Sequence, residues 1–331
     1  MGTLTEQQQT TAAVINAASL PVDAAPVAPE AAIVSAAMGS GWLPPTPDPR
    51  DYTDERPEIK KITKKLKLPK STAEGFEPLP PKVDLRKWCS PVRDQGDILQ
   101  SCTAFAGVGI IEYFEKRAFS KSPVASPQFL YKCTRDIRRV KGDTGAEIRD
   151  VMKALVLFGV PGETYCPYIM SEFDNEPTPF LYAMAGNYKA GNYFCHDPLG
   201  KPKRGKDILY SVKQYLAAGI PAMFGLGLPS PFTEVNIKGA IPFCKKEVVF
   251  ANHALVAVGY NDSLRIRSAS PDVKPTKGAL LVRNCKGPKW GRKGYGWLPY
   301  QYVLSKRARD FWSLLSVDWI DTGNFGLEDP D

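Results

Sequence analysis

Hydrophobic residues recur at steps of three and four in three stretches of the chain, and this spacing predicts three helices. The first begins at Ser101, a residue suited to the N-cap, and the second runs from Gly145 to about Phe158. The third covers about residues 205 to 218, and glycines at positions 159 and 219 end the second and third helices. The apolar faces of the first two helices comprise Phe105, Val108, Ile111, Tyr113, Phe114, Ile148, Val151, Met152, Leu155 and Phe158.

Short apolar runs separated by clusters of Gly, Asn, Asp and Pro fill the last third of the chain and predict strands. The runs cover residues 222–228, 254–260, 279–283 and 312–319. Because helices come first and strands follow, the pattern predicts an α+β fold with a mainly helical lobe at 81–204 and a mainly β lobe at 205–320. An acidic C-terminal tail is expected at 321–331.

Residues 1–80 are rich in Ala, Pro, Thr and Lys and lack sustained periodicity, so we expect an N-terminal tail or pro-segment there. Prolines at positions 44, 45, 47 and 49 impose an extended backbone. Trp42 and Leu43, directly before them, are suited to docking in a groove, although their position is also compatible with a free leader. The six lysines between Lys60 and Lys70 indicate a solvated linker or, alternatively, contact with an anionic surface.

Composition narrows the class of protein. The 331 residues are 43% hydrophobic, which is enough for a buried core, and no uninterrupted apolar run reaches the length of about 20 residues that a membrane span needs. We expect a soluble protein without a membrane span. No lysine or arginine precedes Arg50, which argues against a secretory signal and leaves the localisation open. The formal net charge of +8 is partly local to the lysine run, so no specific nucleic-acid partner is expected.

Cysteine and histidine usage points to thiol chemistry. The seven cysteines are never closer than 13 residues, which fits no zinc motif, and we expect neither a metal nor a cofactor. Cys102 falls in the first turn of the predicted buried helix, where the helix dipole favours a thiolate, although a small buried core residue is the alternative. Of the two histidines, His253 opens a predicted strand that would hold its imidazole rigidly, whereas His196 falls in a predicted turn and is expected to be a solvated loop residue.

A catalytic imidazole needs a third group that fixes its orientation and tautomer. Asn284 directly follows the predicted strand at 279–283 and is suited to this role. An asparagine at a strand end is also a common turn former, so the position of Asn284 alone does not distinguish an orienting role from a turn.

Three segments resemble the active-site motifs of papain-like cysteine peptidases, in the family's order. They are Asp94-Gln95-Gly96 with Ser101-Cys102-Thr103-Ala104-Phe105-Ala106; Asn252-His253-Ala254 with Val258-Gly259-Tyr260; and Asn284-Cys285-Lys286-Gly287 with Trp290-Gly291 and Gly294-Tyr295-Gly296. The resemblance runs from Val83 to about Trp319.

The resemblance implies a papain-like two-lobed fold with the active site in the cleft between the lobes. It implies a low thiol pKa and the catalytic set Cys102 as nucleophile, His253 as base, Asn284 as orienting group and Gln95 as an oxyanion donor beside the N–H of Cys102. It also implies that the backbone of a peptide or protein substrate is bound by Thr144, Gly145, Ala146 and Asn252.

Three departures from the family pattern affect this expectation. One residue more than in papain separates Gln95 from Cys102, so the oxyanion loop must bulge, and Thr103 replaces a tryptophan. Lys286 replaces the tryptophan that in papain covers the bond between asparagine and histidine. We therefore expect that bond to be more exposed to water, the lysine to disfavour imidazolium, and activity to be modest.

The motifs predict a thiol-dependent peptidase that works through an acyl-enzyme on Cys102. Two alternatives use the same fold: a non-catalytic binding or structural protein, and a thiol acyltransferase, which differs only in its acceptor. The N-terminal tail around Trp42 is expected to contact the cleft and to inhibit.

Overall fold

The computed structural model describes residues 40–69, 71–72, 75–120, 123–229, 232, 235, 238–245, 249–269 and 273–315. Most of the expected N-terminal tail, the acidic C-terminal tail at 321–331 and the end of the last expected strand lie outside the described residues.

Helices dominate the part of the chain that follows the predicted nucleophile. α3 (Cys102–Phe119), α4 (Pro127–Ile137) and α5 (Ile148–Leu157) pack together, and α3 is buried on nearly all sides. Gly107 allows this packing, because a Cβ at that position would lie 2.7 Å from Val151 Cγ1 and 2.9 Å from Leu130 Cδ2. The remaining helical elements are α2 (Pro57–Thr63), η1 (Lys64–Leu66), η2 (Arg86–Trp88), η3 (Met170–Glu172), α6 (Pro179–Ala185), η4 (Gly186–Tyr188), α7 (Gly205–Ala217) and α8 (Gln301–Leu304).

A seven-stranded antiparallel sheet forms the other half of the molecule. Its order is β4-β9-β5-β6-β7-β8, and β3 pairs with β6 off this path. The strands are β3 (Lys82–Asp84), β4 (Asn192–Cys195), β5 (Ala222–Pro229), β6 (Val249–Ile266), β7 (Thr276–Arg283), β8 (Tyr295–Pro299) and β9 (Ala308–Leu315). A separate pair comprises β1 (Ser71–Thr72) and β2 (Gly75–Phe76). β3 and β4 lie within the range that the sequence predicted to be mainly helical.

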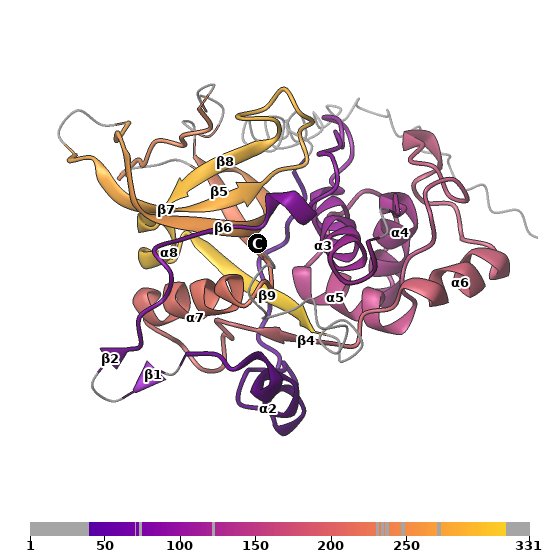
Figure 1. Cartoon of the computed structure of the whole chain (residues 1–331). Coiled ribbons are helices and arrows are strands. Elements are labelled where there is room, and N and C mark those ends of the chain that lie inside the picture. The colour runs from indigo at the N-terminus through magenta and orange to yellow at the C-terminus, as the bar shows by residue number, and fades with distance from the viewer. Residues whose placement is uncertain are drawn as a thin grey trace, which may run out of the picture.

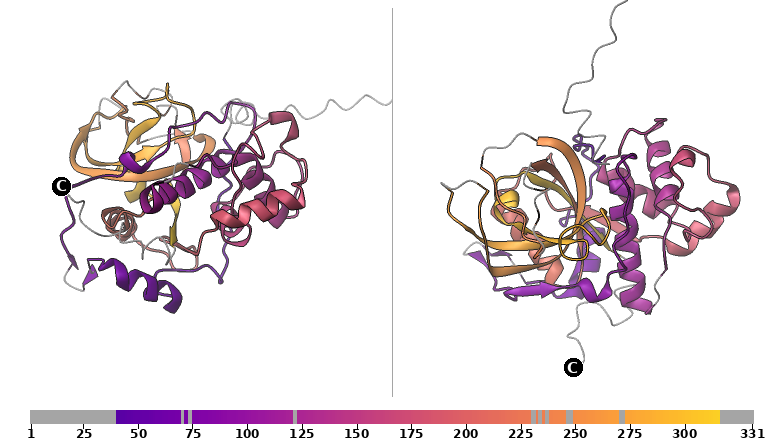
Figure 2. Two further views of the ribbon diagram at one scale, coloured as in Figure 1. Left: turned by 45° about the vertical axis from the view of Figure 1, so that its right-hand side comes forward. Right: turned by 90° about the horizontal axis from the view of Figure 1, so that it is seen from above.

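The two halves lie side by side, with α3 packed against β6 (Figures 1 and 2). α7 packs against β5, β6 and α8. The architecture is therefore the α+β, papain-like arrangement that the sequence predicted, with a helical region beside an antiparallel sheet. The start of α3, the first part of β6 and the end of β7 meet where the halves join.

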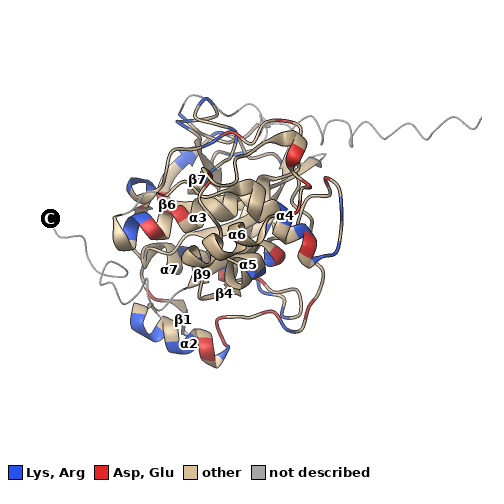
Figure 3. Cartoon of the chain, turned by 90° about the vertical axis from the view of Figure 1, so that its right-hand side faces the viewer, with Lys and Arg blue, Asp and Glu red and all other residues tan. Residues whose placement is uncertain are grey.

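The N-terminal part of the described chain is more ordered than its composition predicted. Ile59, Ile62 and Leu66 are buried in α2 and η1, so the interpretation of this lysine-rich stretch as a solvated linker is wrong. Apolar residues at spacings of three and four dock the segment, while its lysines stay on the outer side (Figure 3).

Residues 40–56 reach the join between the halves before α2 begins (Figure 1). Within the described part of the chain, no helix combines the length and the apolar character that a membrane crossing requires.

Candidate active site

Cys102 is the first residue of α3 and is fully buried. Its Sγ accepts the backbone N–H of Ala254 at 3.4 Å, so the thiol lies against the strand residue that follows His253. Ser101 holds the N-cap position as predicted, but its hydroxyl bonds to the hydroxyl of Tyr168 at 2.8 Å and makes no capping bond to the helix. The N-cap position is therefore confirmed, while a tertiary partner takes the hydroxyl.

His253 is held by the sheet and by Asn284. It lies in β6 opposite Leu226 of β5, and its Nε2 bonds to Asn284 Oδ1 at 2.8 Å. Asn284 directly follows β7, and its backbone N–H donates to Gly294 O at 3.0 Å. Among the described residues, the buried Nδ1 of His253 has no hydrogen-bond partner. The site therefore holds an oriented imidazole with one nitrogen left for chemistry.

His196 is not the solvated loop histidine that the sequence predicted. It is fully buried, with Nδ1 bonded to Ser211 Oγ at 2.8 Å and Nε2 to Ser313 Oγ at 3.0 Å. The reason is that β4 pairs with β9, and the N–H of His196 extends this pairing to Phe311 O, which carries the ring into the core. Burial lowers the pKa of His196 well below its usual value.

Gln95 is buried in the loop that precedes α3. Its Nε2 donates to Leu99 O at 3.1 Å, across the turn that accommodates the extra residue. The loop is also tied to the helical half, since the Gln100 backbone N–H donates to Asp143 Oδ1 at 2.9 Å and its Nε2 donates to Asp143 O at 2.8 Å. These bonds hold the bulged loop in place.

Cys285 is a site residue that the sequence reasoning missed. Its Sγ donates to Gln95 Oε1 at 2.7 Å and lies 3.7 Å from His253 Nε2. Because the amide oxygen of Gln95 faces this thiol, its NH2 group must point the other way. The sequence did hold a signal for Cys285, because it directly follows Asn284 within the motif that resembles the family's asparagine motif.

Lys286 does not leave the bond between His253 and Asn284 open to water. Its Nζ turns to the oxyanion loop, where it donates to Gly96 O at 2.9 Å and pairs with Asp97 Oδ1 at 2.8 Å. Phe232 packs edge-on against His253 with ring centroids 6.3 Å apart, and Trp290 stacks on Phe232. The predicted exposure is therefore wrong, because these aromatic rings cover the bond in place of the missing tryptophan.

The N-terminal segment, residues 40–43, occupies the join beside Cys102. The backbone N–H groups of Gly41 and Trp42 donate to Asn252 O at 3.0 and 3.2 Å. Ala146 donates to Gly41 O at 2.8 Å and accepts from Leu43 N–H at 2.9 Å. Two of the four residues expected to bind substrate backbone therefore bind this segment.

The other two expected substrate-binding residues shape the same loop. Gly145 approaches the segment so closely that a Cβ there would lie 2.3 Å from Gly41 O, and its N–H donates to the Tyr131 hydroxyl. Thr144 bonds within its own loop, to Gly145 O at 3.2 Å.

Burial suppresses charge on the thiol and the imidazole. It raises the pKa of Cys102 to about 12, against the opposing effect of the Ala254 and Trp42 N–H groups. Burial also lowers the pKa of His253 to about 4, and the positive charge of Lys286 acts in the same direction. In this state the two groups are a neutral thiol and a neutral imidazole.

A thiol at a helix N-terminus, beside a strand-borne imidazole that is held by an asparagine, defines a papain-like cysteine peptidase site. Comparisons with known proteins agree. The crystal structure of xylellain, a cysteine protease from Xylella fastidiosa, matches with a TM-score of 0.65 and 29% sequence identity, over 85% of this chain and 97% of that chain.

Sequence comparison gives relatives of the same class. An uncharacterized peptidase C1-like protein of Acanthamoeba polyphaga mimivirus is 28% identical over 297 residues, which cover 87% of this chain and 90% of that protein. Cathepsin K of Gallus gallus is 28% identical over 221 residues, which cover 65% of this chain and 58% of cathepsin K. No family model matches the chain. The chain is thus similar to papain-like cysteine peptidases and is a divergent relative of them.

Proposed function

We propose that this protein hydrolyses peptide bonds through an acyl-enzyme on Cys102. The observation that carries the proposal is the bond between His253 and Asn284, which leaves the buried Nδ1 of His253 without a partner among the described residues. A buried polar atom without a partner costs free energy, and a proton from the neighbouring thiol would satisfy it.

The reaction follows from these roles. His253 Nδ1 takes the proton of Cys102, and the thiolate attacks the peptide carbonyl carbon. The imidazolium then gives that proton to the leaving amine, and a thioester remains on Cys102. Water, deprotonated by the same nitrogen, cleaves the thioester and restores the thiol. The oxyanion is stabilised by the N–H of Cys102 and by the Gln95 amide, and one such donor is typically worth about 3 kcal/mol.

The N-terminal segment inhibits the enzyme in this conformation. It occupies the backbone-binding groups of Ala146 and Asn252 and removes water from Cys102 and His253. A thiol with its pKa raised to about 12 is a poor nucleophile at neutral pH, so burial keeps the enzyme latent.

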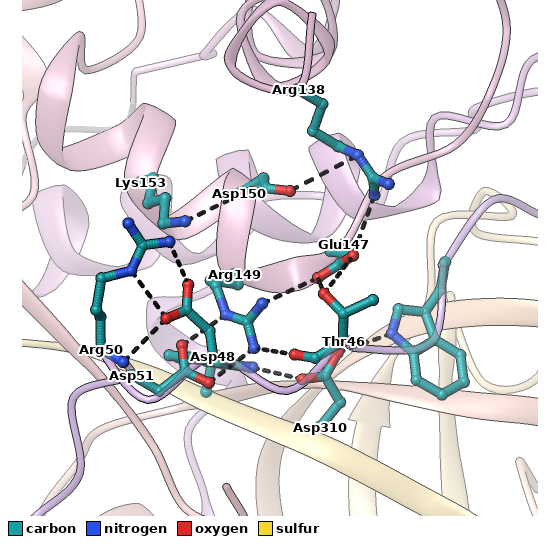
Figure 4. Close-up of polar contacts among 12 residues, drawn as sticks. Thr46, Asp48, Arg50, Asp51, Arg138, Glu147, Arg149, Asp150, Lys153 and Asp310 are labelled. Carbon is teal, nitrogen blue, oxygen red and sulfur yellow. Dashed lines mark hydrogen bonds and ion pairs between the residues drawn. The ribbon is translucent and has the colours of Figure 1, made fainter. Parts of the chain in front are cut away.

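Ion pairs anchor the segment on its C-terminal side (Figure 4). Arg149 of α5 pairs with Asp51 Oδ1 and Oδ2 at 2.5 and 2.7 Å and donates to Thr46 O at 2.7 Å. Arg149 and Asp51 are both buried, so removing either partner alone would leave an uncompensated charge. The anchored part is thus built into the fold, and only residues 40–43 need to leave the site.

Gly41 offers a way to expel the segment from the full-length chain. Its φ is +141°, and a Cβ there would lie 2.0 Å from Gln100 O. The Gly41→Val variant therefore cannot keep this geometry. Gly200→Val is the matched control, since a Cβ at Gly200 meets nothing within 4 Å.

The test compares the hydrolysis of a short fluorogenic peptide by the full-length chain and by both variants. We expect Gly41→Val to raise kcat/KM by about tenfold or more, Gly200→Val to leave it unchanged, and Cys102→Ala in the Gly41→Val background to abolish hydrolysis. Hydrolysis that survives Cys102→Ala would refute the acyl-enzyme. Equal rates for Gly41→Val and the unmodified chain would refute inhibition by the segment.

A further inference from the structure

The pocket that holds the Trp42 side chain has a buried carboxylate at its base. We infer that Asp310 is a specificity-determining residue that selects peptide substrates with a tryptophan side chain at this pocket. The inference rests on the proposed peptidase function and names the side chain that the site accepts.

The Trp42 pocket is shaped for a flat ring with one N–H at its edge. The indole is almost fully buried, and its Nε1 donates to Asp310 Oδ2 at 2.8 Å. The ring lies against Gly225 of β5, where a Cβ would be 2.0 Å from Cε2 of the indole. The guanidinium of Arg309 lies 5.6 Å from the ring centroid.

Asp310 is held in a fixed orientation by its neighbours. Its φ is +62°, a left-handed conformation that few residues other than glycine adopt. Asp197 holds this turn, since its carboxylate accepts the backbone N–H groups of Asp310 and Phe311 at 2.8 and 2.7 Å. The other oxygen of Asp310 accepts Trp312 Nε1 at 2.6 Å. One carboxylate oxygen is therefore committed to the core, and the other is presented to the pocket.

A substrate that displaces the segment would meet the same pocket. The backbone of residues 41–43 is held by Ala146 and Asn252, and a peptide that binds these groups presents a side chain where Trp42 now lies. Without Trp42, Asp310 Oδ2 is a buried carboxylate oxygen that has lost its N–H donor. A phenylalanine or leucine side chain would leave it unsatisfied, and sites built around a hydrogen bond reject such analogues strongly.

The shape of the pocket favours an indole over a cationic side chain. The ring lies against Gly225, and the guanidinium of Arg309 lies over it. Arg149 and Glu147 act on Asp310 in opposite directions, and they pair with each other. A substrate lysine or arginine would bring a second cation beside Arg309, whereas the indole supplies the N–H donor without a charge.

The test uses a full-length chain that carries both Gly41→Val and Trp42→Ala, which empties the pocket. The probes are a synthetic peptide with the sequence of residues 40–44 and the same peptide with phenylalanine in place of tryptophan. Their affinities are measured by calorimetry at pH 8, above the value of about 6 to which burial raises the pKa of Asp310 in the unmodified chain. Binding needs no catalysis, so this readout is independent of the proposed reaction.

We expect the phenylalanine peptide to bind at least about tenfold more weakly, as the loss of a hydrogen bond to a charged group implies. Adding Asp310→Asn, which tolerates the left-handed backbone, should reduce this ratio to about threefold or less, while the surface control Asp207→Asn should keep it. Equal affinities of the two peptides, no binding of either, or a ratio unaffected by Asp310→Asn would overturn the inference. Hydrolysis of fluorogenic peptides that carry tryptophan or phenylalanine then tests the proposed function separately. If neither peptide is cleaved but the tryptophan peptide still binds selectively, the peptidase function fails and the specificity of the pocket stands.

Discussion

The two histidines show how one side chain serves two purposes in the same core. Both are almost fully buried, and burial lowers the pKa of both. His196 has each ring nitrogen bonded to a serine hydroxyl, whereas His253 has one nitrogen bonded to Asn284 and the other without a partner among the described residues. Burial therefore does not distinguish a catalytic histidine from a structural one, but the satisfaction of its two nitrogens does.

Replacing His253 should have the largest effect on activity. We expect His253→Ala in the Gly41→Val background to lower kcat/KM by about a thousandfold or more, because the variant lacks the unpartnered imidazole nitrogen that takes the proton of Cys102. Steady-state hydrolysis of a fluorogenic peptide measures the loss. An active His253→Ala variant would mean that the unpartnered nitrogen is not the base.

Replacing His196 should affect stability instead. His196→Ala removes the imidazole partner of two buried serine hydroxyls and opens a cavity beside Tyr215, which should cost roughly 2–4 kcal/mol of unfolding free energy. Denaturant titration measures the cost. The folded fraction should retain its kcat/KM. A loss of activity as large as that of His253→Ala would contradict a purely structural role for His196.

Asn284 should be the minor member of the catalytic set. Asn284→Ala removes the acceptor that orients His253 but leaves the imidazole on β6, so we expect kcat to fall by about 10- to 100-fold without abolition. Activity below that of His253→Ala would show that Asn284 does more than orient the ring.

Cys285 should affect the oxyanion site through Gln95. Cys285→Ala removes the donor to Gln95 Oε1 and should lower kcat a fewfold, roughly the effect of one misplaced hydrogen bond, with little change in KM. Cys285→Ser should restore the rate, and Cys89→Ala, which removes a buried thiol bonded to Leu85 O, should leave the rate unchanged. If Cys285→Ser is as slow as Cys285→Ala, the thiol acts by packing rather than by its bond.

The last prediction concerns the pH dependence of stability. Both histidines have a folded-state pKa below the unfolded value, so the unfolded chain binds more protons in acid and their contribution to stability falls as the pH drops below about 6.5. For His253 this loss continues down to its pKa of about 4. His196→Gln should flatten the acid slope of unfolding free energy by up to about 1.4 kcal/mol per pH unit, and an unchanged slope would contradict a buried neutral His196.

The sequence predicted the parts of the site that lie on regular elements. Cys102 at the start of a helix, His253 on a strand and Asn284 at a strand end follow from local patterns together with the order of the motifs. The α+β class followed from the hydrophobic pattern, which has the spacing of helices in the first half of the chain and forms short strand-like runs in the second half.

The features that the sequence did not predict depend on tertiary contacts. The segment Cys195-His196-Asp197-Pro198 has the composition of a turn, and only the pairing of β4 with β9 buries His196. Phe232 lies far in sequence from the bond that it covers, and the packing of α2 was hidden by its lysines. Trp42 was recognisable as too apolar for a free tail, but its partner Asp310 is 268 residues away.

The most direct test of the central claim is labelling with a thiol-directed epoxysuccinyl inhibitor, followed by peptide mapping, in the full-length chain and its Gly41→Val variant. We predict slow labelling of the unmodified chain, rapid labelling of the variant at Cys102, and loss of that rapid labelling when His253→Ala is added. Modification at Cys285 in place of Cys102, or no modification of the folded Gly41→Val variant under reducing conditions, would contradict the account.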